Sequence, residues 1–209
     1  MKNTVRLLRY AGGDESHAEA AWASTGGMTE EKRSRMPGLI MQLGTSDPRH
    51  TVPFEHSWLQ FAITCDTASH IQILKHRTLS VNAESARYKE YKEDKYYVPV
   101  DWPDYETEPL KDWCEIAYYQ YHDYVEGLNS LGTGLTRKRA KESARYFLPY
   151  AIQVNLVVSG NFHAYANFWK LRNSDQAQLE IHQIAAEMLR LVKEETNDSF
   201  RHSLDAWGL

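Results

Sequence analysis

The stretch ILKHRTLSVNAESARYKEY, residues 73–91, carries the features that decide this chain's fold. Two lysines, one histidine and two arginines lie in it, interleaved with threonine, serine and asparagine. The whole chain has a formal net charge of −4, so this cationic cluster is a local feature. It fits a solvated surface near a helix end, where cations meet the helix dipole. It also fits a pocket for phosphate or carboxylate, which arginine binds with planar paired donors.

The residues before this cluster predict a strand and then a helix. Trp58–Asp66 alternates, with Leu59, Phe61, Ile63 and Cys65 on one side, which is typical of a half-buried strand.

The helix that follows should begin at Asp66 or Thr67, because either side chain can accept backbone N–H bonds. Its apolar positions Ala68, Ile71 and Leu74 recur at helical spacing. The helix then delivers Lys75, His76 and Arg77 at its C-terminal end, and residues 78–91 are predicted to be irregular and polar.

The rest of the chain predicts mostly helices with a few antiparallel strands, and no βαβ rhythm. This pattern indicates an α+β class in a single domain, residues 1–209. The expected elements are a strand at Thr4–Tyr10; a helix at Ser16–Leu43 interrupted near Thr25–Gly27 and Met36–Gly38; an extended segment at Tyr96–Val100; a loop at Asp101–Pro109; a helix at Leu110–Leu128 ended by Asn129–Gly134; a basic helix capped by Thr136 and stopped by Pro149; a strand at Ile152–Val158; and helices at Asn161–Leu171 and Ser174–Glu195.

Composition excludes several classes of function. The negative net charge argues against binding nucleic acid through an extended basic surface. No apolar run approaches the roughly 20 residues of a membrane span, and the N-terminus lacks the apolar core of a signal peptide. Cys65 and Cys114 are far apart and form no CxxC pattern, so we expect buried, reduced thiols in a cytoplasmic protein.

Some residues outside the cluster are candidates for chemistry. His50, Glu55 and His56 could hold a metal, but their spacing matches no recognised zinc motif, so we predict no metal and favour loop-fixing hydrogen bonds or ring stacking. Ser85 could be a nucleophile only with a general base within reach, and a phosphate-binding or structural serine is favoured. Arg145 is expected in mid-helix, with its stem covering apolar surface.

Together these stretches resemble one family, the flavin-dependent thymidylate synthases. The family signature, Arg-His-Arg, seven residues and then Ser, has the fuller form RHRxxSxNExSxRY, and residues 75–88 of this chain are KHRTLSVNAESARY. Four further blocks resemble family patterns in the same order: HTVPFEH (50–56), ARYFLP (144–149), NFHAYANFWKLR (161–172) and AQLEI (177–181).

The resemblance implies a fold, an activity and an assembly. The family converts dUMP to dTMP, with methylenetetrahydrofolate as carbon donor and NADPH reducing FAD, which supplies the hydride. Its fold is an antiparallel sheet flanked by helices, assembled as a homotetramer with active sites between subunits.

The resemblance also implies roles for individual residues. Catalysis would rest on Arg172, lying against the uracil and polarising it, and on Ser85. We expect Arg87, Arg145 and Arg172 to face a common cavity that neighbouring subunits form together. The residues expected to bind dUMP are Gln72, Glu84, Ser85, Ala86, Arg87, Arg145 and Arg172. Those expected to bind FAD are Ser24, Glu55, Lys75, His76, Arg77, Thr78, Asn82, Asn161, His163 and Asn167, with His50 beside the flavin and folate.

The chain departs from the family pattern at a few of these positions. Lys75 replaces the first arginine of the signature and loses its paired donors. Ile71, Ala83 and His163 stand where arginine, glutamate and arginine are common, and Val52 replaces a threonine. These changes fit a divergent synthase, but also a flavin-dependent dUMP hydroxymethylase of the same fold. A non-catalytic homologue that binds nucleotide through the same cations is a third alternative.

Overall fold

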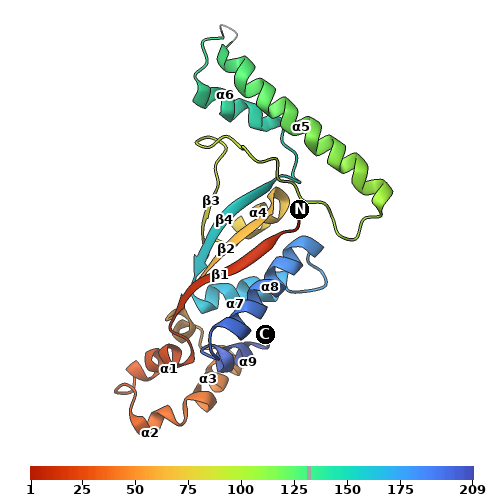
Figure 1. Ribbon diagram of the computed structural model, residues 1–209. Helices are drawn as coiled ribbons and strands as arrows, with labels where there is room; N and C mark the ends of the chain where they lie inside the picture. The colour runs from red at the N-terminus through yellow and green to blue at the C-terminus, as the bar shows by residue number, and fades with distance from the viewer. Residues whose placement is uncertain (131–132) are drawn as a thin grey trace. The chain divides into compact units, whose positions relative to one another are not determined.

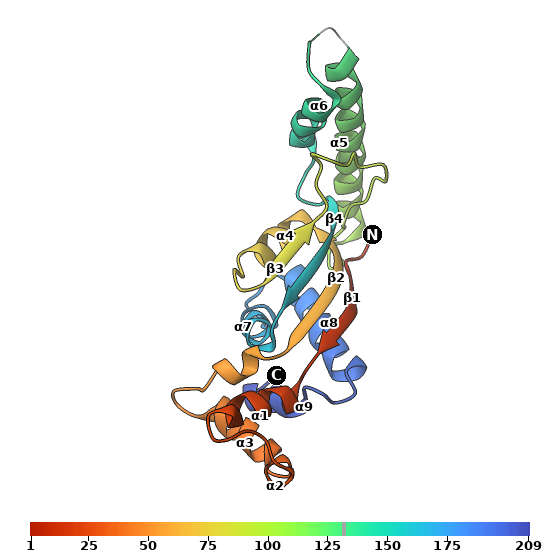
Figure 2. The same ribbon diagram turned by 90° about the vertical axis from the view of Figure 1, so that its left-hand side faces the viewer.

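The computed structural model describes residues 1–130 and 133–209 (Figures 1 and 2). The chain forms two compact units, each built from separate pieces of the sequence. Unit 1 comprises Met1–Thr4, Thr64–Ile73 and Asn82–Leu156. Unit 2 comprises Val5–Ile63, Leu74–Val81 and Val157–Leu209. A single domain over the whole chain stays a prediction.

Four strands form one antiparallel sheet in the order β1-β2-β4-β3, and the α+β class is confirmed. The three strands predicted near these positions are present as β1, β2 and β4. The fourth, β3, contradicts the irregular structure expected for residues 78–91. An edge strand pairs on one side only and can therefore be short and polar. Such a strand shows no clear alternation of apolar residues, so the sequence pattern did not indicate it. The strands are β1 (Thr4–Ala11), β2 (Trp58–Asp66), β3 (Ser80–Ala83) and β4 (Gln153–Gly160).

Helix α4 (Thr67–Leu74) follows β2 directly, as predicted. Asp66 is its cap, since its Oδ1 accepts from the Ser69 amide at 2.8 Å. The apolar positions that indicated this helix do not form its buried face: Ile71 and Leu74 are 38% and 48% exposed, whereas Ser69 and Ile73 are buried. A short helix buries a narrow i, i+4 stripe, and here polar Ser69 lies in that stripe because its hydroxyl also bonds Asp66.

Unit 1 contains a long helix, α5 (Asp104–Ser130), packed on α6 (Arg137–Ala144) and the 3₁₀ turn η2 (Arg145–Phe147) (Figure 1). The predicted loop to Pro109 is wrong. Pro109 removes only one hydrogen bond near the exposed start of the helix. Thr136 caps α6 as predicted, but Arg145 follows that helix instead of lying within it. Of the predicted stop Asn129–Gly134, Leu131 and Gly132 lie outside the described residues.

The core of unit 1 lies between α5, α6 and the start of β4. Tyr118, Tyr121, Val125, Ala144 and Ile152 are its buried members. The extended segment expected at Tyr96–Val100 is reduced to one isolated bridge, from Tyr96 to Ile152.

Unit 2 holds the remaining helices. The break expected at Thr25–Gly27 is present, but α3 begins where a second break was expected, because Pro37 near the first position of a helix favours its start. The last helix was not predicted. These elements are α1 (Asp14–Ala23), α2 (Glu30–Arg33), α3 (Met36–Thr45), the 3₁₀ turn η1 (Val52–Glu55), α7 (Phe162–Arg172), α8 (Leu179–Glu195) and α9 (Arg201–Trp207).

Helix α7 packs on the part of the sheet that belongs to unit 2. The Tyr165 ring contacts Phe61 edge-on at 5.3 Å, and its hydroxyl donates to the Val158 carbonyl at 2.9 Å. This packing fixes α7, which carries several of the predicted site residues. Within the described ranges, no helix has the length and apolarity needed to cross a membrane.

Candidate functional site

Unit 1 contains a pocket of about 290 Å³ that gathers part of the predicted nucleotide site. Four of the predicted residues line it: Glu84, Ser85, Ala86 and Arg145. The other lining residues are Thr67, His70, Tyr91, Leu148, Pro149, Tyr150, Ile152 and Val154. A cation, a hydroxyl and a backbone turn therefore face one hollow, which suits a phosphorylated ligand.

The segment after β3 is held by local hydrogen bonds. The Ser85 hydroxyl accepts from the Arg87 amide at 3.3 Å. The Glu84 carboxylate takes the Lys89 ammonium at 2.7 Å and the Asn155 amide at 3.0 Å. Glu84 is thus bound to the protein on both sides, so within this site the backbone of residues 84–86 is the better ligand group.

Arg87 does not line the pocket. Its Nε donates to Glu142 on α6 at 2.9 Å, and this pairing raises the pKa of Arg87 and lowers the pKa of Glu142. Arg145 does line the pocket, whereas Arg172 belongs to unit 2. Within the single chain Arg87 is turned to a carboxylate of the chain itself instead of to this pocket. The convergence of the three arginines across subunits stays a prediction.

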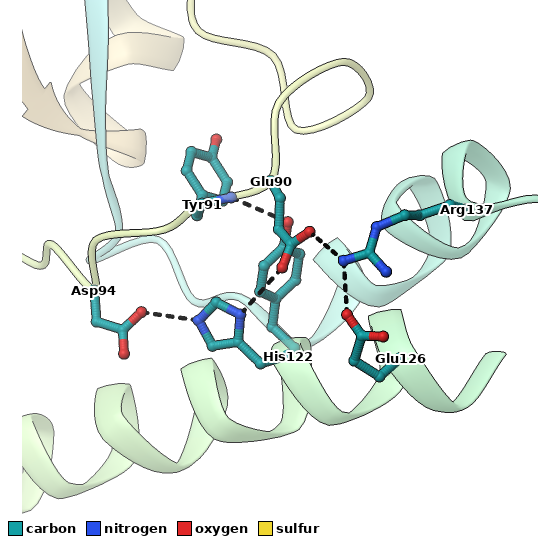
Figure 3. A network of polar contacts seen from close by, with 7 residues as sticks. Glu90, Tyr91, Asp94, His122, Glu126 and Arg137 are labelled. Carbon is teal, nitrogen blue, oxygen red and sulfur yellow. Dashed lines mark hydrogen bonds and ion pairs between the residues drawn. The ribbon is translucent and has the colours of Figure 1, made fainter. Parts of the chain in front are cut away.

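A network of polar contacts ties the rest of this segment to α5 and α6 (Figure 3). His122 contacts Asp94 at 3.0 Å, and Arg137 bridges Glu90 and Glu126 at 2.8 and 2.6 Å. The Tyr91 amide donates to the Tyr121 hydroxyl at 3.3 Å. Because Tyr91 lines the pocket, these contacts hold one of its walls.

Unit 2 brings together two other predicted residues, His76 and Arg172. Arg172 Nε donates to His76 Nε2 at 3.0 Å, and the His76 ring contacts Phe168 edge-on at 4.9 Å. Burial first, and the nearby Arg172 charge second, lower the pKa of His76. The imidazole is therefore neutral at neutral pH and can accept the arginine's hydrogen bond.

The cations beside His76 fit a phosphate-bearing dinucleotide such as FAD. Lys75 and Arg77 are exposed, and neither forms an ion pair within the described ranges. Two unneutralised cations and two hydroxyl-bearing neighbours, Thr78 and Ser80, form a donor set of the kind that binds pyrophosphate oxygens. The residues present therefore fit the cofactor that the resemblance implies.

A second group in unit 2 surrounds Trp207, which sequence inspection missed because α9 was not predicted. His163 contacts this ring at 5.4 Å and pairs with Glu55 at 3.2 Å. Arg49 and Lys170 lie 5.0 and 5.1 Å from the ring centroid. These two cations therefore share the Trp207 ring with the predicted residue His163, which pairs with Glu55. Arg49 also directly precedes the predicted residue His50 in the sequence.

Asn161, another predicted residue, has a structural task at the start of α7. Its side chain accepts from the Ala164 amide at 2.8 Å and caps the helix. One side-chain donor group remains available for a ligand, because the amide nitrogen is not used in this cap.

Three buried side chains and the half-buried Ser57 support the start of α7 through a chain of hydrogen bonds in which every donor points the same way. Ser203 donates to Asp14 at 2.5 Å, so the Ser203 oxygen must accept from His17 Nδ1 at 2.8 Å. His17 Nε2 then accepts from Ser57 at 2.8 Å, and Ser57 accepts from the Phe162 amide at 3.4 Å. Burial, with a smaller effect of His56, lowers the pKa of His17 to about 3, which keeps this ring neutral.

The remaining predicted residues are spread over both units. Gln72 is half-buried on α4 and Asn82 is exposed on β3, in unit 1. In unit 2, the Ser24 hydroxyl donates to the Ala21 carbonyl at 3.0 Å, and His50 and Asn167 are exposed. Within the described ranges, no group of three or more His, Cys, Asp and Glu residues could hold a metal ion.

Sequence inspection missed two residues of unit 1: His70 lines the pocket, and Glu142 pairs with Arg87. Glu142 lies three positions before Arg145, so helical spacing could have placed it near the nucleotide arginines. His70 lies on α4 before Gln72, and a lone histidine gives no signal of this kind.

Comparison with known proteins identifies relatives that share most of the chain. A model of the family described as "Thymidylate synthase complementing protein" matches residues 6–196. A flavin-dependent thymidylate synthase of Pseudothermotoga lettingae is 31% identical over 197 residues, covering 90% of this chain and 84% of the relative. That of Kosmotoga olearia is 29% identical over 212 residues, covering 92% and 86%.

A solved structure also matches. The UMP/dUMP methylase PolB from Streptomyces cacaoi, bound with 5-Br dUMP, superposes with a TM-score of 0.76 at 25% identity, covering 99% of this chain and 95% of PolB. With the family match over residues 6–196, the signature at residues 75–88 and the α+β sheet, this agreement confirms the resemblance. The chain belongs to the flavin-dependent thymidylate synthase family.

Proposed function

We propose that this protein converts dUMP to dTMP by flavin-dependent reductive methylation, with FAD as cofactor and NADPH and methylenetetrahydrofolate as co-substrates. The observation that carries this proposal is the pocket lined by Ser85, Ala86 and Arg145 in a member of this family. The nucleotide bound to PolB, 5-Br dUMP, supports dUMP as the substrate class.

On the nucleotide side, Arg145, the Ser85 hydroxyl and the backbone of residues 84–86 bind the phosphate. Arg87 also binds the phosphate once it releases Glu142. This exchange is possible because carboxylate and phosphate oxygens accept hydrogen bonds from the planar guanidinium group in a similar way. Ser85 then acts as a binding group and not as a nucleophile, because no histidine contacts its hydroxyl in the described part of the chain.

Arg172 carries the polarising role. Its Nε donates to neutral His76, which holds the guanidinium group in an orientation from which it can donate to a uracil carbonyl. Such donors stabilise enolate-like negative charge on the uracil, which makes the base nucleophilic toward the carbon donor. When bound, FAD reduced by NADPH supplies the hydride that completes the methyl group.

Unit 2 supplies the residues for the cofactor. Lys75, Arg77 and Thr78 bind its phosphates, and His163, Asn167 and the free amide of Asn161 contact the rest. Glu55 orients His163 through their pairing at 3.2 Å. Ser24 and His50 complete the predicted set in unit 2, with His50 beside the flavin and folate, and Asn82, which lies in unit 1, stays a prediction.

We further propose a cytoplasmic homotetramer with active sites between subunits. The exposed apolar residues Trp113, Ile116 and Tyr119 on α5, which are 56%, 53% and 67% exposed, support a subunit contact there. Light scattering coupled to gel filtration should give four chains per particle. A monomer at assay concentration would contradict this assembly.

An anaerobic assay tests the activity. Purified protein with FAD, NADPH, methylenetetrahydrofolate and dUMP should yield dTMP by mass spectrometry, and omitting NADPH should abolish the product. A colourless protein that refuses added FAD would overturn the proposal. PolB is described as a UMP/dUMP methylase, so UMP is the comparison substrate.

The same assay decides the alternative product. A dUMP hydroxymethylase of this fold would release hydroxymethyl-dUMP, which is heavier than dTMP by one oxygen. This alternative is supported by Lys75 and His163, two predicted flavin-binding residues that replace arginines of the family pattern. A product with the mass of dTMP alone removes it.

A further inference from the structure

His70 is a pocket residue to which the family resemblance assigns no role. It lies on α4 in unit 1 and lines the same hollow as Ser85 and Arg145. Its side chain is half-buried, between the capped start of α4 and Gln72. It is therefore placed to contact whatever occupies this pocket.

The two ring nitrogens of His70 differ in their surroundings. Nε2 is enclosed by protein and has no hydrogen-bond partner in the described part of the chain. Nδ1 also has no partner there, but it is not among the enclosed atoms and so remains reachable. Burial lowers the pKa of His70, so the ring is neutral at neutral pH and carries one proton.

That proton belongs on Nδ1. A buried N–H group without an acceptor is rare in folded proteins, so the enclosed Nε2 keeps its lone pair and the reachable Nδ1 carries the hydrogen. A neutral imidazole in this tautomer presents a single hydrogen-bond donor to the accessible side.

We propose that His70 is a substrate-contacting residue whose Nδ1–H donates to an uncharged oxygen of the nucleotide, either a uracil carbonyl or the deoxyribose hydroxyl. This inference rests on the proposed function, because it takes dUMP as the occupant of the pocket.

A phosphate oxygen fits His70 less well. An anion beside the ring would favour the imidazolium form, and its second proton would sit on the enclosed Nε2 without an acceptor. Arg145 and Ser85 already provide donors for the charged end of the nucleotide. His70 is therefore assigned to the uncharged part.

Calorimetric titration of dUMP into the FAD-loaded protein tests this assignment. His70→Phe keeps a ring but removes the donor, and should weaken dUMP binding about three- to tenfold, the range for a neutral hydrogen bond. His70→Asn places an amide near the position of Nδ1 and should stay within about twofold of the wild type. In turnover, the Phe variant should raise KM with little change in kcat.

A nucleotide lacking the 3′-hydroxyl distinguishes the two acceptors. If His70 contacts the sugar, dideoxy-UMP should bind the wild type and His70→Phe equally. If it contacts the base, the ratio between the two proteins should persist. Either result supports a contact with an uncharged oxygen.

Two different outcomes would contradict the proposed function and the role of His70, so the two can be tested separately. Wild-type protein that binds no dUMP would end the proposed function. Wild-type protein that binds dUMP while His70→Phe binds it equally well would end the role of His70 alone. Melting temperature and flavin absorbance verify that the variant is folded, and His70→Leu replaces His70→Phe with the same expectation if the Phe variant does not fold.

Discussion

The predicted site residues of the two units differ in how their positive charge is paired. In unit 1 several cations near the pocket are paired with carboxylates of the chain, Arg87 with Glu142, Lys89 with Glu84, and Arg137 with Glu90 and Glu126, whereas the pocket residue Arg145 forms no ion pair in the described ranges. In unit 2, Lys75 and Arg77 are left without such partners in the described ranges, and Arg49 and Lys170 share the Trp207 ring.

This difference indicates how each unit would gain its ligand. A neutralised arginine must exchange one anion for another, so binding gains little net charge interaction. An unpaired lysine or arginine gains a charge-assisted hydrogen bond outright. We therefore expect unit 2 to provide the larger electrostatic share of binding, and unit 1 to provide selectivity.

The largest expected effect is at Arg172. Arg172→Ala should lower kcat/KM about 10²- to 10³-fold, because it removes a donor to charge that develops in the transition state. Arg172→Lys should recover only part of this loss, since lysine cannot keep both the His76 contact and a second planar donor. Steady-state kinetics measures the effect and far-UV circular dichroism verifies the fold. Near-normal turnover of the alanine variant would contradict the assigned role.

The unpaired cations come next. The double variant Lys75→Ala and Arg77→Ala should raise the dissociation constant for FAD about 10- to 100-fold, as expected when hydrogen bonds to charged groups are lost. Flavin absorbance after dialysis measures retention. The matched control is Arg190→Ala on α8, an exposed arginine already paired with Glu187 and Glu194. Equal flavin retention in both proteins would break the comparison between neutralised and unpaired cations.

The buried His17 gives unit 2 a pH-dependent stability. Its pKa is about 3 in the folded chain and about 6.5 when unfolded, so the unfolded state binds more protons in between. Stability is therefore fully present above pH 6.5 and falls as the pH drops toward 3. At pH 5 this histidine alone should cost about 2 kcal/mol.

Urea unfolding at pH 7.5 and pH 5 measures that cost. His17→Gln should remove a large part of the difference between the two conditions, because the titrating ring is gone. His70 and His76, whose pKa values are also lowered, act in the same direction and leave a residual slope. An unchanged slope in the variant would assign the effect elsewhere.

The smallest effect concerns the Arg87–Glu142 pair. Glu142→Gln should tighten dUMP binding about two- to fivefold, since exposed ion pairs are weak and their loss frees Arg87 for the phosphate. Calorimetry measures this, with Glu187→Gln as the control. Weaker binding in Glu142→Gln would mean that Glu142 positions Arg87 instead of competing for it.

The sequence predicted the fold well where local signals are strong. Alternation identified β2, the cap at Asp66 marked the start of α4, and Thr136 marked α6. The sequence pattern did not predict β3, an edge strand of four residues of which two are polar. It also predicted a loop up to Pro109, whereas α5 accommodates this proline near its start. Local rules cannot supply the one-sided pairing that makes a polar edge strand.

The site was predicted mainly through the family signature. The signature pointed to Ser85, Ala86 and the cations after α4, and ARYFLP pointed to Arg145; of these, Ser85, Ala86 and Arg145 line the pocket of unit 1. It could not show that Arg87 pairs with Glu142, nor that His70 lines the pocket, because both depend on contacts between distant residues. The roles assigned to these residues remain predictions.

The one-way chain from Phe162 to Asp14 has a consequence for how this protein can vary. Each hydroxyl and the imidazole in it have a single orientation, so a substitution at one position leaves its neighbour with an unmatched donor or acceptor. Repairing that mismatch requires a second, compensating change. Ser57, His17, Ser203 and Asp14 should therefore be inherited as a set, with intermediate combinations of these residues less stable than either end point.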